Sequence, residues 1–339
     1  MGDVSDGPRV AADAGTIRRG RYGAVVHQEE RGSAQQITVG VAVGAGAAVA
    51  GLLPWIITGM RLPLQNLWAT PTTDPSDMPI ALLPFSQYAV TTIAALLLVG
   101  GVVAGIAVRV LRARGSVRRS GSLAALAGLV GVQVVAVVET AVVTGAGMRM
   151  DGTPGTGADV SAAQLYVVAL TVGSLVCIGA AAVLAALVAR AAPGGALVAL
   201  ALGAVALGSW ANTFVVPPVS SPGDAAGVVL AVLRWLPAVA VGAAVAWTGL
   251  RTVGQGIAAL IALGLLWTGT AAITAVSYAL GSRVYLPYPL EMVSAGATVF
   301  VMAMGPAGAT LVPLLVAAVI GVAGAVVVRL RDGRRRSEP

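Results

Sequence analysis

The sequence is informative first through the residues that it lacks. It contains no lysine, a single cysteine, Cys177, and a single histidine, His27. Without lysine there is no complete Walker A loop and no Schiff-base lysine, so the chain does not power itself with ATP. One cysteine excludes an internal disulfide and a multi-cysteine metal site, and one histidine excludes an HExxH zinc site. We therefore expect no metal and no cofactor.

Charge is also scarce. Only 10% of the residues are charged, 57% are hydrophobic and the mean hydropathy is +0.89, whereas soluble domains carry about 25% charged residues. Such a chain lacks the polar surface that water requires, so we expect an integral membrane protein. The net charge of +7 comes from arginines in short loops beside apolar runs. We therefore expect membrane lipids as partners and no nucleic acid.

A helix that spans a membrane needs about 20 apolar residues, and the sequence predicts a bundle of about eight such helices. The fold class that follows is an all-α, polytopic (multi-pass) integral membrane protein. The eight apolar stretches cover approximately 37–59, 87–111, 122–147, 163–189, 195–216, 226–248, 255–279 and 309–329.

Three regions follow from composition. Residues 1–35 are rich in Gly, Asp and Arg without apolar periodicity, which predicts a disordered cytoplasmic tail. Residues 36–330 form the transmembrane helical domain, and residues 331–339 form a short basic cytoplasmic tail.

The arginines predict the orientation. With both ends of the chain in the cytoplasm, 17 of the 21 arginines fall on the inner side, as the positive-inside rule favours. Arg61, Arg149 and Arg283 fall outside, and Arg234 lies within a span. We therefore expect a protein of the cell (plasma) membrane with both termini cytoplasmic.

The segment 290–304 (LEMVSAGATVFVMAM) is apolar but too short for an ordinary span. A ninth crossing would place the two ends on opposite sides, against the distribution of arginine. We expect a short re-entrant or interfacial helix on the outer side, with an ordinary amphipathic helix as the alternative. Irregular backbone at membrane depth survives only where protein or a wet cavity covers it.

Two ionisable side chains stand out within the spans, Glu139 in the third and Arg234 in the sixth. Each lies about eight residues from the outer end of its span, or about 12 Å at 1.5 Å per residue. Because a lone charge in hydrocarbon costs several kcal/mol, such residues pair. We predict that Glu139 and Arg234 form an ion pair, either as a structural fastener or as a substrate or proton site in an outward-open cleft.

Other polar residues have a similar predicted depth. Asn212 and Trp210 lie near the outer end of span five, and Gln133 lies below Glu139 in span three. Pro237 follows Arg234 by three residues and predicts a kink in span six. Small-residue pairs such as Gly40 and Gly44 predict close helix packing within the chain, with dimerisation as the alternative.

These features favour a permease-like or transport-associated protein with an outward-facing polar site made of Glu139, Arg234, Asn212, Gln133 and Trp210. A separate ATPase or an envelope protein is the partner that we expect beside lipid. Two alternatives stay open. One is a membrane enzyme acting on a lipid-linked substrate at the outer leaflet, which would have to recruit Asp74 or Glu291. The other is a non-catalytic scaffold of the cell envelope.

Overall fold

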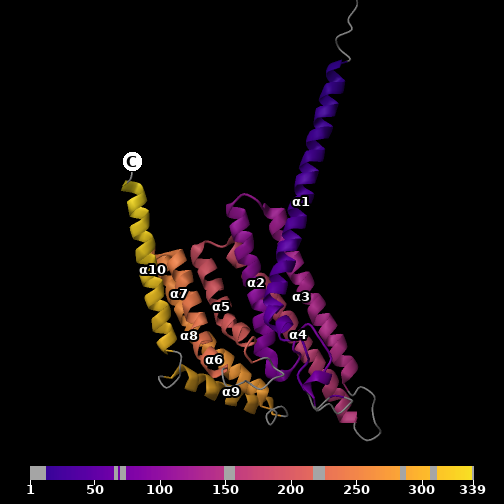
Figure 1. The fold of residues 1–339 in the computed structure, drawn as a ribbon, viewed down its shortest axis with the longest axis vertical. Coiled ribbons are helices and arrows are strands. Elements are labelled where there is room, and N and C mark those ends of the chain that lie inside the picture. The colour runs from indigo at the N-terminus through magenta and orange to yellow at the C-terminus, as the bar shows by residue number, and fades with distance from the viewer. Residues whose placement is uncertain are drawn as a thin grey trace, which may run out of the picture.

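The structure, a computed structural model, describes residues 13–64, 68, 74–148, 157–216, 226–282, 288–305 and 311–337. Within them it has ten α-helices and two short 3₁₀ helices (Figure 1). In chain order these are α1 (Asp13–Ile57), η1 (Pro75–Asp77), η2 (Gln87–Ala89), α2 (Val90–Ala113), α3 (Arg119–Gly147), α4 (Gly157–Arg190), α5 (Pro193–Asn212), α6 (Ala226–Leu233), α7 (Leu236–Thr248), α8 (Val253–Gly281), α9 (Pro289–Met304) and α10 (Leu311–Ser337).

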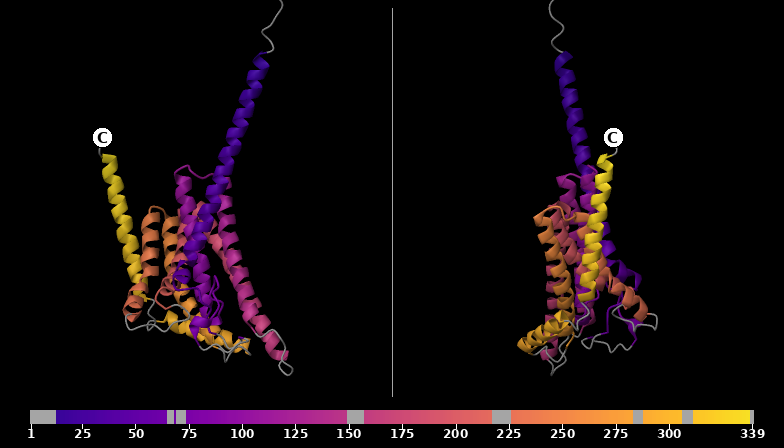
Figure 2. Two further views of the ribbon diagram at one scale, coloured as in Figure 1. Left: turned by 45° about the vertical axis from the view of Figure 1, so that its right-hand side comes forward. Right: turned by 90° about the vertical axis from the view of Figure 1, so that its left-hand side faces the viewer.

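The eight predicted crossings are confirmed, with boundaries that differ by a few residues. In the part of the chain that is described, eight helical stretches are long and apolar enough to span a membrane, and α6 and α7 together make the sixth. α1 begins and α10 ends on the same side of the bundle (Figures 1 and 2). We call this side the arginine-rich end and the opposite side the loop end.

The N-terminal segment departs from the predicted disorder in one respect. Helix α1 begins at Asp13, so the backbone is helical where the sequence predicts a disordered tail. Helix propagation from an established span adds one hydrogen bond per residue, which favours such an extension. Residues 1–12 lie outside the described part of the chain. At the other end, α10 continues through the predicted basic tail to Ser337.

Helix α9 crosses the loop end of the bundle and lies across the direction of the spans, packed on α8 (Figure 2). Gly296 is its buried residue and faces Ala275 and Ala279 of α8. Leu290 and Val293 on another face are exposed. Residues 290–304 therefore form a short helix that lies across the end of the bundle and does not run along the spans (Figure 2), as the length of the segment predicts.

The eight spans form two halves in which the helices pair in the same order. In the first half α1 packs on α3, α2 on α4, and α1 on α2. In the second half α5 packs on α8, α7 on α10, and α5 on α7. The two halves lie side by side and run in the same direction (Figure 1). They meet mainly where α5 packs on α2 and α4, and there Trp210 donates a hydrogen bond from Nε1 to the carbonyl oxygen of Gly51 in α1, at 2.7 Å.

Glycine explains why α1 and α3 approach so closely. A Cβ atom on Gly44 would overlap the carbonyl group of Ala125, and one on Gly40 would overlap that of Gly121. Gly101 and Gly105 of α2 face α4 in the same way. Small residues let helix backbones touch in a membrane, and the predicted packing within the chain is confirmed for these four glycines.

Arginines stabilise helix ends at the arginine-rich end. Arg109 of α2 donates from Nη1 to the carbonyl oxygens of Val188 and Ala191, at 2.7 and 3.1 Å, and Arg112 donates to Ala189, at 2.9 Å. The last carbonyls of a helix lack intrahelical partners and carry partial negative charge, so these cations stabilise the C-terminus of α4. The guanidinium of Arg109 also lies 5.0 Å from the ring centre of Trp247 in α7, which joins the two halves.

Candidate functional site

The chain between α1 and α2 enters the bundle instead of staying outside it. After α1 it reverses at Gly59, whose φ of +98° favours glycine, and the stretch Met78–Ser86, which we call the inserted segment, then runs between the helices without helical structure. Met78, Leu83 and Phe85 are fully buried. From the sequence, non-helical backbone within the bundle was considered only for residues 290–304. The structure has such backbone in the inserted segment.

Backbone groups of the inserted segment are held from both sides. Trp55 of α1 donates from Nε1 to the carbonyl oxygen of Ala81, at 2.9 Å, and the N–H of Ala81 donates to the carbonyl oxygen of Met60. Arg61 donates from Nη1 to the carbonyl oxygen of Met78, at 2.8 Å. Buried backbone groups need such partners, since an unpaired one costs free energy comparable to a lost hydrogen bond.

Helix α3 contacts the inserted segment through Glu139 and Thr140. The N–H of Leu82 donates to Oε2 of Glu139 at 2.9 Å, and the N–H of Leu83 donates to Oγ1 of Thr140 at 2.9 Å. The hydroxyl of Thr140 in turn donates to the same Oε2, at 3.1 Å. One carboxylate oxygen therefore accepts two hydrogen bonds, and a continuous chain joins α3 to the inserted segment.

The buried face of α3 carries more polar atoms than these contacts use. Gln133, Thr140 and Thr144 are buried and recur at helical spacing on one side of the helix. Gln133 donates from Nε2 to the carbonyl oxygen of Leu97, at 2.8 Å. Its Oε1 atom and Oγ1 of Thr144 have no hydrogen-bond partner among the described residues. Buried polar atoms without a partner are rare and indicate a site for water or a ligand.

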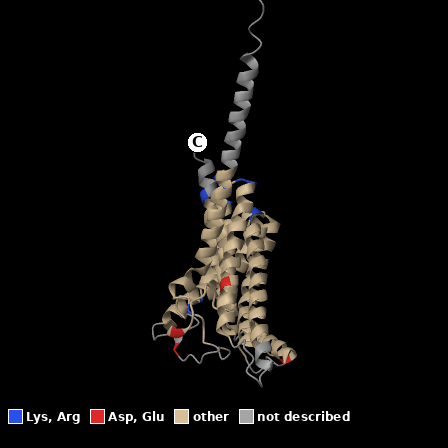
Figure 3. Cartoon of the chain, turned by 90° about the vertical axis from the view of Figure 1, so that its right-hand side faces the viewer, with Lys and Arg blue, Asp and Glu red and all other residues tan. Residues whose placement is uncertain are grey.

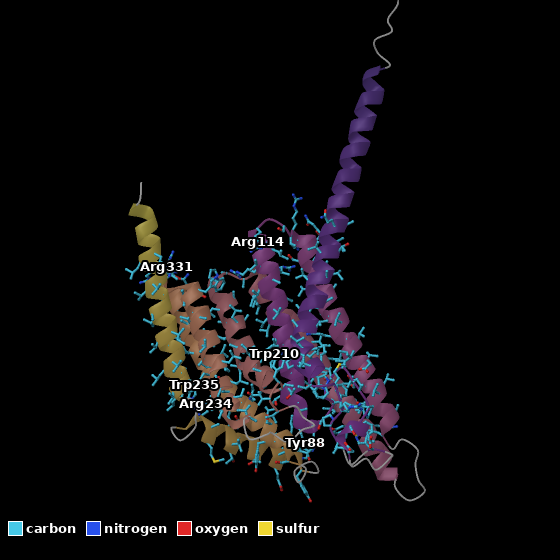
Figure 4. The ribbon with its side chains drawn as sticks, viewed as in Figure 1. Tyr88, Arg114, Trp210, Arg234, Trp235 and Arg331 are labelled. Carbon is cyan, nitrogen blue, oxygen red and sulfur yellow. The ribbon has the colours of Figure 1, made fainter. Side chains whose placement is uncertain are left out.

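Arg234 does not take part in this site, and the predicted ion pair is wrong. Arg234 is exposed and lies with its guanidinium 4.9 Å from the ring centre of Trp235, while Glu139 uses the inserted segment and Thr140 as partners. α3 belongs to the first half and α6 to the second, where it packs on α5. Figure 4 places Arg234 and Trp235 near α10, on the far side from α3. Equal depth along the membrane normal did not imply lateral contact.

The other predicted site residues divide into two groups. Gln133 lies on the same helix as Glu139, and Trp210 packs against the core cluster that contains Leu83 and Phe85. Asn212 is exposed at the end of α5, away from these contacts. The predicted break in span six is present, because α6 ends at Leu233 and α7 begins at Leu236, one residue before Pro237.

The carboxylates considered for an enzyme lie elsewhere. Asp74 is in the exposed turn before η1, where its Oδ1 accepts a hydrogen bond from the N–H of Ser76 at 2.8 Å, and this bond lowers the pKa of Asp74. Glu291 lies exposed in the first turn of α9. The described residues contain no group of three or more His, Cys, Asp or Glu side chains that could hold a metal ion. An acid–base pair built on Glu139 receives no support from this arrangement.

Charges divide the molecule along its length. Most of the basic residues that are described lie toward the end where α10 finishes, a few lie toward the other end, and the described acidic residues lie in the middle and toward that other end (Figure 3). Arg114 and Arg331 are labelled at the first end in Figure 4, and Tyr88 at the other. This distribution agrees with the charge bias that the sequence shows, whichever side of the membrane the two ends face.

Sequence reasoning missed the inserted segment and Thr144. The inserted segment is short, proline-flanked and without periodicity, so nothing in it separates it from an external loop. Thr144 was detectable, because it continues the spacing of Gln133 and Thr140 by one further turn. Comparison of the chain with the models of known protein families, with curated proteins and with solved structures finds no match.

Proposed function

We propose that this protein is a permease-like, proton-coupled transport protein of the cell membrane. Its site is the polar face of α3, on which Gln133, Thr140 and Thr144 are buried and Glu139 is partly buried. The inserted segment covers that site at the loop end, which in this proposal faces outward. The arginine-rich end, with both termini, faces the cytoplasm, as the positive-inside rule favours.

The observation that carries the proposal is the contact between Glu139 and the backbone of the inserted segment. Of the residues in the eight spans, Glu139 alone has a carboxylate. An ionisable residue within a span is by default a candidate for a substrate or proton pathway. Its partner is irregular backbone, which occurs within membrane proteins where it is buried in protein or lines a cavity. The two features meet at one atom, Oε2.

The chemistry follows from that atom. The N–H groups of Leu82 and Leu83 donate to Oε2 of Glu139 and Oγ1 of Thr140. A hydrogen-bond donor on a substrate, or a proton on Glu139, can take the place of these N–H groups. Protonation of Glu139 removes the charge that strengthens the bond to Leu82, since a bond to an ionised acceptor is about twice as strong as a neutral one. The inserted segment is then held more weakly, and the atoms of Gln133 and Thr144 that have no partner among the described residues extend the polar face along α3. Because the chain has no nucleotide-binding loop, the energy comes from the ion gradient or from a separate ATPase chain.

Proton flux into proteoliposomes tests the proposal. We expect an imposed pH gradient to acidify a trapped pH-sensitive dye faster with the protein than in protein-free vesicles, and Glu139→Gln to remove the difference. Glu291→Gln, a change of the exposed carboxylate on α9, is the matched control and should retain the flux. Equal rates with and without the protein would reject proton coupling through Glu139.

A second candidate is a non-catalytic component of the cell envelope. The hydrogen bonds from Leu82 and Leu83 to α3 also favour this function. In a scaffold their role is structural, because Glu139 and Thr140 pair backbone groups that would otherwise have no partner. Solvent access separates the two functions. A cysteine placed at Thr144 in a Cys177→Ala background reacts with a small, charged thiol reagent if the polar face opens, and stays unreactive at every pH if the bundle is only a scaffold.

A further inference from the structure

Helix α9 packs on the side of α8 and not on its end. A Cβ atom on Gly296 would lie 3.3 Å from the Cβ atom of Ala279 and 3.7 Å from the carbonyl oxygen of Ala275, and α8 continues to Gly281. At 1.5 Å per residue, α9 therefore crosses α8 about 3–9 Å before the loop end of that span. The surroundings of α9 are those of the last two turns of a span.

The length of α8 relates this crossing point to the membrane. The helix has 29 residues and extends about 43 Å. A bilayer measures about 40–45 Å with its headgroup regions and about 30 Å across its hydrocarbon core. A span as long as α8 therefore reaches through both headgroup regions. A point about 3–9 Å from its end lies at the boundary between headgroups and acyl chains.

Exposed tyrosines mark the same level of the bundle. Tyr278 in the last turn of α8 and Tyr288 directly before α9 are each about half exposed. The ring of Tyr88 lies beside Gly281 at the end of α8, and Figure 4 places Tyr88 at the loop end. Tyrosine is enriched where membrane proteins meet the headgroups, because its ring is apolar and its hydroxyl is polar. These side chains independently place the ends of α8 and α9 at that boundary.

The exposed residues of α9 fall into two stripes at helical spacing, beside the face that packs on α8. The apolar stripe consists of Leu290, Val293, Ala297 and Val301, and the polar stripe consists of Glu291, Ser294 and Thr298. Leu290 is 86% exposed and Val301 is 69% exposed, so nothing within the described residues covers the apolar stripe. A helix with one apolar and one polar exposed face is the type that lies in the plane of a membrane interface.

We propose that the apolar stripe of α9 lies among the acyl chains of the leaflet at the loop end, with the polar stripe toward water. The occupant is lipid, because the stripe continues the membrane-facing surface of α8, where Val276 is exposed beside Ala275. Anionic headgroups are not required. The sequence of α9 has no arginine and one acidic residue, Glu291, so its attachment comes from burial of apolar surface. The proposal does not depend on the transport function.

Electron paramagnetic resonance of nitroxide labels tests this placement in the full-length protein. The labels are attached to Val293→Cys and Val301→Cys in the apolar stripe, and to Ser294→Cys and Thr298→Cys in the polar stripe, each in a Cys177→Ala background. In phosphatidylcholine nanodiscs, we expect labels of the apolar stripe to collide with oxygen and to lose contact with a water-soluble nickel chelate. Labels of the polar stripe are the matched controls, since they are exposed on the same helix, and should keep the nickel contact.

Three results would overturn the proposal. Nickel contact at all four labels would place α9 in water. Loss of both oxygen and nickel contact at Val293→Cys and Val301→Cys would show that protein covers the apolar stripe, which in a purified sample means a second copy of this chain. Loss of nickel contact only after phosphatidylglycerol is added would show that charge, and not apolar burial, attaches the helix. Leu290→Cys, at the end of the apolar stripe, replaces either variant of that stripe that does not fold.

Discussion

The carboxylate of Glu139 accepts a hydrogen bond from the backbone N–H of Leu82, 57 positions earlier in the chain, at 2.9 Å. The bond links a span to the irregular segment beside it. A hydrogen bond to a charged group contributes about 1.5–3 kcal/mol to stability, roughly twice the value of a neutral bond. The charge of Glu139 is thus used locally, which explains why this residue needs no arginine partner.

The first prediction concerns the acceptor at position 139. Glu139→Gln keeps a side-chain oxygen in reach of the Leu82 N–H but loses the charge, so we expect a small fall in Tm in detergent. Glu139→Leu leaves that partly buried N–H without a partner, a loss of up to about 1–3 kcal/mol, so its Tm should fall further. Equal Tm values for the two variants would show that the hydrogen bond contributes nothing to stability.

The second prediction replaces the expected ion pair. Since Glu139 and Arg234 lie in different halves without a shared partner, their effects should add in the double variant Glu139→Gln/Arg234→Gln, within about 0.3–0.5 kcal/mol. Arg234 is exposed and its cation–π contact with Trp235 is worth about 0.5–1 kcal/mol, so Arg234→Gln alone should change Tm little. Thermal unfolding of all four proteins completes the cycle. If the double variant is markedly more stable than the sum of the two single effects predicts, Glu139 and Arg234 interact and the ion pair exists.

The spans were predictable because the constraint behind them acts on each segment separately. Every backbone polar group must be paired within the apolar core of a membrane, so about 20 apolar residues imply a helix whatever surrounds them. The same reasoning identified 290–304 as too short to cross, and the structure has there the short helix α9, packed across the end of the bundle on α8. The division of the eight spans into two halves was not predictable. The sequence shows no clear internal repeat, and the pairing of α1 with α3 depends on tertiary packing.

The site was only partly predictable for a related reason. Depth along a span follows from counting residues, so Glu139 and Gln133 were placed correctly on α3. Lateral neighbours follow from packing, and there the prediction of Arg234 as the partner of Glu139 failed. The polar face of α3 could have been found from the spacing of Gln133, Thr140 and Thr144. The inserted segment could not, because its backbone N–H groups, not its side chains, make the contact.

The third prediction tests the close packing of α1 on α3. In Gly44→Ala the new Cβ overlaps the carbonyl group of Ala125, and because backbone atoms cannot move aside the helices must separate. Overpacking of this kind costs about 1–3 kcal/mol, so Tm should fall. Gly46→Ala is the matched control, since nothing lies within 4 Å of a Cβ at that position. Gly→Ala by itself raises helix propensity in both variants, so an equal change of Tm in the two would show that the close approach at Gly44 contributes nothing to stability.

The last prediction concerns orientation, on which the outward-facing site depends. Ser76 before α2 and Ser116 between α2 and α3 are both exposed serines, one at the loop end and one at the arginine-rich end. In a Cys177→Ala background, a cysteine at Ser76 should react with an impermeant thiol reagent in intact cells, and a cysteine at Ser116 only after the membrane is permeabilised. The reason is the excess of arginine beside Ser116, which retains that end in the cytoplasm. The reverse pattern would turn the polar face of α3 toward the cytoplasm, and labelling of both cysteines in intact cells would contradict a crossing by α2.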